Sequence, residues 1–225
     1  MKLKLNSLLL ATAAVLASPA AHAQFFGNSG GGTNFPQGAV SFADAVVAFN
    51  PVIQNGEPIA ANLQPLSALG VPNHRTGDLC VANVPCSAVS LGDGGTITLQ
   101  FVDNRLTGSG DNKADLWVFE VGTDIEDTFV EISKDGVQWF AVGKVFGSTA
   151  GVDIDAFGWN TTDLFAFVRL RDDPLLDGQV GASVGADIDA VGAISTVAIP
   201  EPGTWALMLA GLAAVAGLAQ RRAAH

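Results

Sequence analysis

From residue 39 to residue 197 the chain is a succession of short apolar runs separated by residues that favour turns. In the segment 96–101 apolar and polar residues alternate strictly, which places Ile97, Leu99 and Phe101 on one buried face of a strand. The segment 115–121 is apolar on both faces, so it is predicted to be a central strand. Further strands are predicted at 45–49, 129–133, 137–142, 164–170 and 188–195.

The connections between these runs favour antiparallel pairing. Lys134-Asp135-Gly136 separates two of the predicted strands, and Asp-Gly is a strong signal for a tight hairpin turn. No helical period of apolar residues lies between the predicted strands, whereas a parallel sheet needs crossover helices. The sequence therefore predicts an all-β fold, an antiparallel jelly-roll-like β-sandwich.

The N-terminal end has the pattern of an export signal. Lys2 and Lys4 precede an apolar stretch at 8–16, and Ala21-His22-Ala23 is a small-residue cleavage site. An uncleaved helix is the alternative, but the apolar stretch is short for a membrane span. Residues 24–35 are rich in Gly, Ser and Asn and are predicted to be a flexible mature N-terminus.

The C-terminal end combines a short motif, one apolar run and a basic end. Pro200-Glu201-Pro202 precedes the apolar run 204–219, which Arg221 and Arg222 follow. The prolines bar helix, so Glu201 is expected in an extended peptide that a protease can grip. The run is about 16 residues, against roughly 20 for a typical span, and is predicted to be a transmembrane helix with the arginines on the cytoplasmic side. A buried core helix, a permanent anchor and a tail exchanged for a lipid are the alternatives.

Together these C-terminal features closely resemble the PEP-CTERM sorting signal of Gram-negative bacteria. The resemblance implies export through the Sec machinery, an inner-membrane intermediate held by the C-terminal helix, and processing by an exosortase near Glu201. Glu201 would then be recognised by the exosortase and would not itself be catalytic. The body of the protein is expected to reach the cell surface or the extracellular space. The expected organisation is a signal peptide at 1–23, a flexible segment at 24–38, a β-sandwich domain at 39–197 and the sorting signal at 198–225.

The body between the two ends is strongly acidic. The whole chain has 22 acidic and 11 basic residues, of which 21 acidic and 7 basic residues lie outside the two ends, a net charge of about −14. Because contacts with phosphate need a basic patch, nucleic acid is not an expected partner. The remaining length of about 176 residues is that of one domain with its own core.

Cys80 and Cys86 are the only cysteines of the chain. In an exported protein, two cysteines this close in a loop that contains Pro and Asn predict a local disulfide. A metal site is less favoured because no pair of histidines accompanies them, and the redox spacing CxxC is absent.

The order of the strand motifs carries a family resemblance. The segments concerned are 45–51, 69–72, 89–92 with 94–101, 116–121, 130–139, 167–170 and 186–194. In this order they resemble the galactose-binding-like, discoidin-type β-sandwiches of bacterial surface proteins. The resemblance implies the fold, but it does not by itself imply carbohydrate binding, because such folds host many functions.

Aspartates near glycine-rich turns are candidate ligands for a structural Ca²⁺. The segment 151–158 (GVDIDAFG) recurs as 185–192 (GADIDAVG), and the two aspartates of each copy share one side if the segment is extended. Ca²⁺ prefers carboxylate and carbonyl oxygens, although the EF-hand spacing is absent. Alternatively, these aspartates cap turns or face solvent. The family resemblance places a cation near the first sheet loop and the last strand, which points to Asp111, Asp115, Asp187 and Asp189, with Glu120 as a further ligand.

Trp139 and Trp159 are the candidate ligand-binding residues, because an exposed indole ring can stack on a sugar ring. Trp159 lies in a Gly/Asn/Thr loop and is the better candidate of the two. The alternative for both side chains is burial in the core.

No catalytic residue is predicted. His74 is the only histidine of the body, and no Ser-His-Asp, H-E-x-x-H or phosphate-loop pattern is present. The sequence predicts a non-catalytic, exported cell-surface or extracellular matrix protein associated with exopolysaccharide in biofilms, in a binding or structural role. A dedicated carbohydrate-binding module is the first alternative. A small polysaccharide-acting hydrolase with paired carboxylates is the second.

Overall fold

The computed structural model describes residues 22–28, 31–75, 86–121, 126–146, 149–175, 181–199 and 202–223. Most of the predicted signal peptide, Cys80, Pro200 and Glu201 lie outside these residues. The cleavage at Ala23, the Cys80–Cys86 disulfide and the extended conformation of Glu201 therefore stay predictions.

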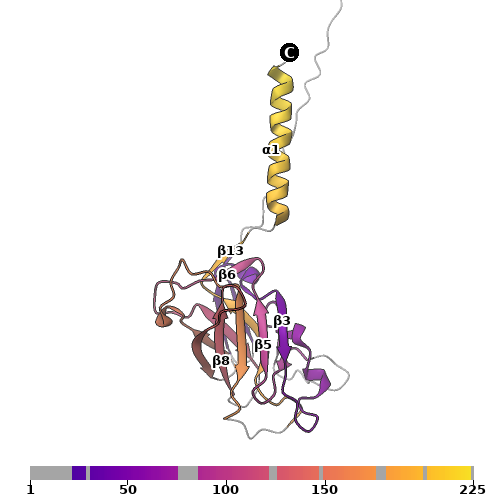
Figure 1. The fold of residues 1–225 in the computed structure, drawn as a ribbon, viewed down its shortest axis with the longest axis vertical. Coiled ribbons are helices and arrows are strands. Elements are labelled where there is room, and N and C mark those ends of the chain that lie inside the picture. The colour runs from indigo at the N-terminus through magenta and orange to yellow at the C-terminus, as the bar shows by residue number, and fades with distance from the viewer. Residues whose placement is uncertain are drawn as a thin grey trace, which may run out of the picture.

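Two antiparallel sheets form the body (Figure 1). The four-stranded sheet has the order β10-β7-β12-β4, made of β10 (Thr149–Val152), β7 (Leu116–Glu120), β12 (Asp187–Ala193) and β4 (Val89–Ser90). The five-stranded sheet has the order β3-β5-β11-β8-β9, made of β3 (Ala45–Asn50), β5 (Thr96–Gln100), β11 (Phe167–Asp172), β8 (Asp127–Ser133) and β9 (Phe140–Phe146). The all-β prediction is confirmed.

The two sheets share one apolar core because their strands alternate inward and outward side chains. Ile97, Leu99 and Phe101 are fully buried, as the alternation of their segment predicts. From the other sheet, Leu116 and Val118 enter the same core. Trp117 and Phe119 point to the opposite face of β7, which is covered by a second cluster of aromatic rings. This double burial agrees with the prediction of a central strand.

Short connecting elements complete the body. Four of them are short 3₁₀ turns: η1 (Gly38–Ser41), η2 (Ala60–Asn62), η3 (Pro65–Ala68) and η4 (Asp155–Phe157). The predicted hairpin is confirmed, since β8 pairs with β9 and Gly136 adopts a positive φ of 76° between them.

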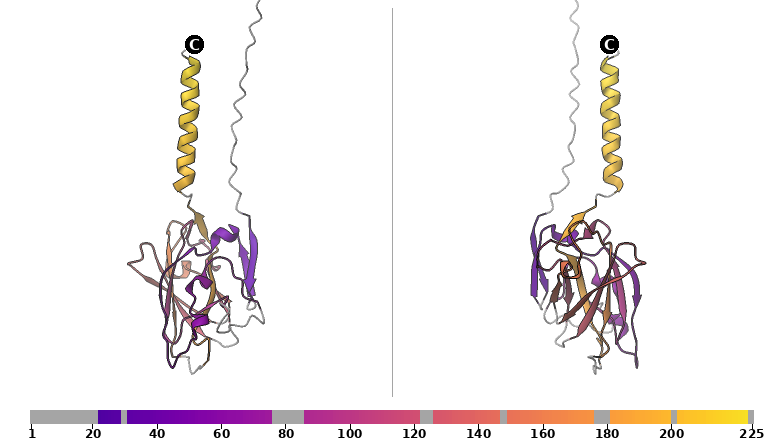
Figure 2. Two further views of the ribbon diagram at one scale, coloured as in Figure 1. Left: turned by 90° about the vertical axis from the view of Figure 1, so that its right-hand side faces the viewer. Right: turned by 60° about the vertical axis from the view of Figure 1, so that its left-hand side comes forward.

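The N-terminal segment differs from the flexible chain expected from its composition. β1 (Gln24–Asn28) and β2 (Gly31–Phe35) pair in antiparallel register and lie against one side of the sandwich (Figure 2). Phe35 is fully buried and packs with Phe42 and Phe119. The Gly-rich composition conceals this packing because only two of its aromatic side chains, Phe26 and Phe35, contact the apolar face.

A second small sheet lies at the end of the sandwich nearest to α1 (Pro202–Ala223) (Figure 1). It pairs β6 (Asn104–Leu106) with β13 (Thr196–Ala198). Met208, Leu209, Leu212 and Val215 of α1 are exposed. Within the described part of the chain, no helix is both long enough and apolar enough to cross a membrane. The transmembrane helix predicted at 204–219 is not supported by this finding.

Candidate functional site

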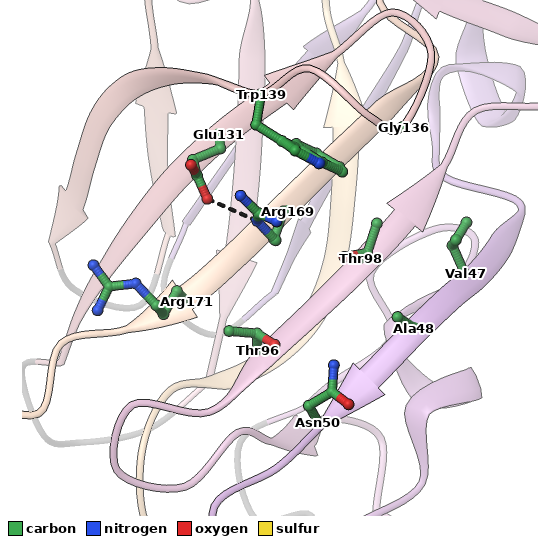
Figure 3. A pocket seen from close by; sticks show the side chains of 10 residues that line it. All are labelled: Val47, Ala48, Asn50, Thr96, Thr98, Glu131, Gly136, Trp139, Arg169 and Arg171. Carbon is green, nitrogen blue, oxygen red and sulfur yellow. Dashed lines mark hydrogen bonds and ion pairs between the residues drawn. The ribbon is translucent and has the colours of Figure 1, made fainter.

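A cavity of about 600 Å³ opens on the outer face of the five-stranded sheet, on the side away from the core (Figure 3). Four strands and the turn between β8 and β9 supply its walls. The residues that line it are Val47, Ala48, Asn50, Thr96, Thr98, Glu131, Gly136, Trp139, Arg169 and Arg171. Trp139, one of the two tryptophans proposed from the sequence, therefore lies in the cavity.

Strand alternation and register place the polar side chains of this face. In β11, Val168 and Leu170 are buried in the core, so Arg169 and Arg171 point outward. Arg169 pairs with Thr98 of β5 and with Glu131 of β8, because β11 lies between these two strands. Cross-strand neighbours on one face lie about 5 Å apart, so their side chains meet.

Arg169 is held between two partners. Its Nε donates to Glu131 Oε2 at 2.7 Å, and its Cζ lies 4.3 Å from the centroid of the Trp139 ring (Figure 3). Because the guanidinium is planar, it can pair with a carboxylate at its edge while its face lies over an aromatic ring. Trp139 follows the turn that Asp135 caps by accepting hydrogen bonds from two backbone N–H groups, so the indole is fixed at one end of the cavity.

Arg171 has a different environment. Its Cζ lies 4.2 Å from the Phe129 ring, and it makes no salt bridge with a described residue. Lys144 Nζ lies 4.7 Å from the centroid of the same ring, and it forms salt bridges with Asp127 Oδ2 at 2.6 Å and Asp173 Oδ2 at 2.5 Å. Arg171 is therefore the arginine of the cavity whose donors are not already used by a carboxylate.

Trp159, the better candidate on sequence grounds, does not line this cavity. Its ring centroid lies 4.7 Å from that of Phe140 and 5.0 Å from that of Phe165, and it packs against the main core. Lys134 Nζ lies 5.6 Å from the Trp159 centroid. The half-buried ring thus stabilises the loop after η4, which is the alternative that the sequence left open.

The acidic residues proposed as Ca²⁺ ligands are not brought together in one site. Asp111 is half-exposed and pairs with Lys113 at 2.6 Å. Asp115 is buried and lies near Asp153 and Asp155 instead, with one carboxylate oxygen of each within 4.8 Å of the others. The cation predicted from the family resemblance would need ligands that the structure places in separate parts of the body.

Glu120 and Asp187 are the two proposed ligands that lie near each other. Both are almost fully buried, and burial raises the pKa of Glu120 to about 10, with the charges of Glu126 and Asp187 acting in the same direction. Burial also raises the pKa of Asp187, to about 7, although a hydrogen bond from the Ser90 hydroxyl opposes this shift. Glu120 Oε2 has no hydrogen-bond partner in the described part of the chain.

Asp189 joins segments that are distant in the sequence. Its Oδ1 accepts from the Asn73 N–H at 3.0 Å, and its Oδ2 accepts from the His74 N–H at 3.3 Å and from Asn28 Nδ2 at 3.4 Å. Burial nevertheless raises its pKa. The donors around its carboxylate give it a structural role at the hairpin side of the sandwich.

The repeated octapeptide has two different conformations. The copy at 185–192 enters β12, whereas the copy at 151–158 leaves β10 and turns into η4. Asp153 Oδ1 accepts from the N–H groups of Asp155 and Ala156, so the first copy includes a capped turn. Similar sequences therefore give aspartates with unlike surroundings.

Sequence reasoning missed Arg169 and Arg171. The signal was present, because Val168-Arg169-Leu170-Arg171 alternates apolar and charged residues at the end of the strand predicted at 164–170. Charges at alternate positions mark the face that is not buried. The contribution of Thr96, Thr98 and Asn50 depends on strand order, which the pattern of a single strand does not contain.

Comparison with known proteins identifies the C-terminal segment. Residues 198–223 match the model of the PEP-CTERM protein-sorting motif, which confirms the predicted sorting signal. A signal of this kind marks an exported protein that is processed by an exosortase. No curated protein matches the chain in sequence.

Two solved structures are similar to the body. One is the CBM32-6 domain of GH89 from Clostridium perfringens, with 14% identity, 68% of this chain and 92% of that chain covered, and a TM-score of 0.35. The other is the C-terminal domain of a chitobiase from Bacteroides fragilis, with 13% identity, 72% and 97% covered, and a TM-score of 0.37. At scores this low the likeness carries no argument about what this chain binds.

Proposed function

We propose that this chain is a non-catalytic, exported surface or matrix protein that binds an extracellular polysaccharide on the outer face of its five-stranded sheet. The observation that carries the proposal is the cavity that Trp139, Arg169 and Arg171 line, with the first two already in contact. Association with exopolysaccharide, and hence with biofilm, follows from this binding and from export.

The chemistry of the cavity suits a sugar. Pyranose rings stack their C–H faces on indoles, and their hydroxyl groups accept hydrogen bonds from guanidinium groups. The same hydroxyl groups can donate hydrogen bonds to Thr and Asn side chains and accept hydrogen bonds from them. Trp139 supplies the ring, while Thr96, Thr98 and Asn50 lie on the opposite wall (Figure 3). A ligand between these walls would contact an apolar surface at one end and hydrogen-bonding groups at the other.

The charge of the cavity favours an acidic polysaccharide. The whole chain has a net charge of −11, yet the cavity is lined by two arginines and one carboxylate. Because Glu131 is occupied by Arg169, the charge of Arg171 is left for a ligand carboxylate or sulfate, which a guanidinium binds through two parallel hydrogen bonds.

The same composition supports a binding role over hydrolysis. Glycosidases of the usual kind need two carboxyl groups across the scissile bond. Glu131 is the one carboxylate among the residues that line this cavity, and it is paired with Arg169. We therefore expect no turnover of a bound polysaccharide.

Binding of the full chain to soluble acidic and neutral polysaccharides tests the proposal. We expect Trp139→Ala and Arg171→Ala each to weaken binding to an acidic polysaccharide by about tenfold or more, the effect of losing roughly 1.4 kcal/mol. Lys113→Ala is the matched control, because it removes one positive charge from an exposed position outside the cavity. Equal binding by all four proteins would contradict the proposed site, and binding of neutral polymers alone would contradict its preference for acidic ones.

A further inference from the structure

Three aspartates that do not belong to the cavity lie close together near the small β6–β13 sheet. Asp115 directly precedes β7, Asp153 follows β10, and Asp155 begins η4. One carboxylate oxygen of each lies within 4.8 Å of one oxygen of each of the other two. No lysine or arginine of the described residues forms a salt bridge with any of them.

Backbone donors hold one oxygen of each carboxylate. Asp115 Oδ2 accepts from the Ile154 N–H at 3.0 Å, and Asp153 Oδ1 accepts from the Asp155 N–H at 3.0 Å. Asp155 Oδ2 accepts from the N–H groups of Ser109 and Gly110 at 2.8 and 3.1 Å. The three side chains are thus fixed in position before any ligand binds.

The remaining oxygen of Asp115 is the observation that points to a ligand. The Asp115 side chain is fully buried, and its Oδ1 has no hydrogen-bond partner within the described chain. A buried carboxylate oxygen left unpaired beside two further carboxylates is unfavourable unless a cation compensates it.

We propose that Asp115, Asp153 and Asp155 bind a Ca²⁺ ion, with one carboxylate oxygen from each. This inference is independent of the polysaccharide site. The arrangement suits the ion, because these oxygens lie within 4.8 Å of one another and oxygens bound to one Ca²⁺ at about 2.3–2.6 Å are at most about 5 Å apart. Asp153 and Asp155 are half-buried, so the ion has access from solvent and can keep water ligands.

The position of the site gives the ion a structural consequence. The Asp115 carbonyl oxygen accepts from the N–H groups of Ile194 and Ser195 at 2.6 and 3.2 Å, immediately before β13. Ser195 in turn accepts from the Thr107 N–H at 2.9 Å. A bound Ca²⁺ would therefore stabilise the loop after β6, the turn at η4 and the segment that leads from the sandwich to the sorting signal.

Calorimetric titration of the full chain with CaCl₂, paired with thermal unfolding, tests this site. We expect binding near one ion per chain, and a rise in melting temperature of roughly 5–10 °C at a hundredfold excess over Kd. Asp153→Asn and Asp155→Asn should each weaken Ca²⁺ binding at least tenfold. Asp111→Asn is the matched control, because it removes the same charge from the neighbouring loop but its carboxylate is already paired with Lys113.

The variant Glu120→Gln tests whether Ca²⁺ binds at the three aspartates or at another buried carboxylate. It should leave Ca²⁺ binding unchanged; loss of binding in Glu120→Gln with retention in Asp153→Asn would overturn the assignment. If the aspartate variants do not fold, hydrogen exchange of the wild-type chain decides the question. Ca²⁺ should slow exchange at Ser109, Gly110 and Ile154, whose N–H groups hold the site. The absence of any Ca²⁺ effect on binding, melting or exchange would equally refute the proposal.

Discussion

Glu120 and Asp187 are buried on the neighbouring strands β7 and β12, and their carboxyl groups tend to keep their protons. Burial is the main cause for both, and it raises their pKa values to about 10 and about 7. In an unfolded chain these groups titrate near 4.5 and 3.8. The native state therefore binds more protons than the unfolded state at neutral pH.

The free energy of unfolding should accordingly fall as pH rises. The stability that each group contributes to the folded state is fully present below the pKa of that group in the unfolded chain. It is lost as pH rises through the pKa of the folded state, near 7 for Asp187 and near 10 for Glu120. Glu120→Gln keeps a neutral side chain of similar shape, so it should flatten this dependence. At pH 8 we expect the variant to be more stable than the wild type, because folding of the wild type must take up a proton at Glu120 that the unfolded chain has released, and folding of the variant need not.

Denaturant unfolding between pH 5 and pH 9, with chelator present to remove metal ions, measures this difference. Glu131→Gln is the control, because Glu131 lies on the open face and pairs with Arg169. A wild-type slope identical to that of Glu120→Gln over the whole range would refute the prediction.

At the scale of elements, the β1–β2 hairpin is held to the sandwich by aromatic rings. The centroids of Phe35 and Phe42 are 4.6 Å apart, and those of Phe42 and Phe119 are 6.0 Å apart. Gly192 of β12 permits this approach, since a Cβ there would lie 2.5 Å from the Phe35 ring. The hairpin therefore covers an apolar face of the four-stranded sheet that would otherwise meet water.

Phe35→Ala should destabilise the protein by roughly 3–5 kcal/mol, because it leaves a cavity among fully buried rings. Phe25→Ala, one strand away in the same small sheet, removes a ring that is 62% exposed and should change stability by less than about 0.5 kcal/mol. Chemical denaturation of both variants measures the two values. Equal effects would show that the hairpin does not pack as described.

Elements with strong local patterns were predictable, and short ones were not. The alternation in 96–101 identifies β5, and Asp135-Gly136 identifies the β8–β9 hairpin. β4, with 2 residues, and β6 and β13, with 3 residues each, are too short to show a period. β4 forms because the longer strand β12 offers it hydrogen bonds, whereas β6 and β13 pair with each other, and both pairings depend on the tertiary fold.

At the scale of the molecule, the acidic body and the C-terminal sorting motif belong to one exported protein. The sorting motif covers 198–223 and begins at the last residue of β13. If the chain is exported and processed as proposed, mass spectrometry of the mature protein should find an N-terminus near Gln24 and a C-terminus near Glu201. Secreted material that still carries Arg221 and Arg222 would contradict processing at the motif.

The sequence alone determined the β class, the inward and outward faces of the long strands and the sorting motif, because each depends on residues that are close along the chain. Only the tertiary structure decided which outward residues share a surface. It placed Trp139 with Arg169 and Trp159 against the core, and it grouped Asp115 with Asp153 and Asp155. Strand order and register bring distant residues together, and neither is encoded in the period of any one strand.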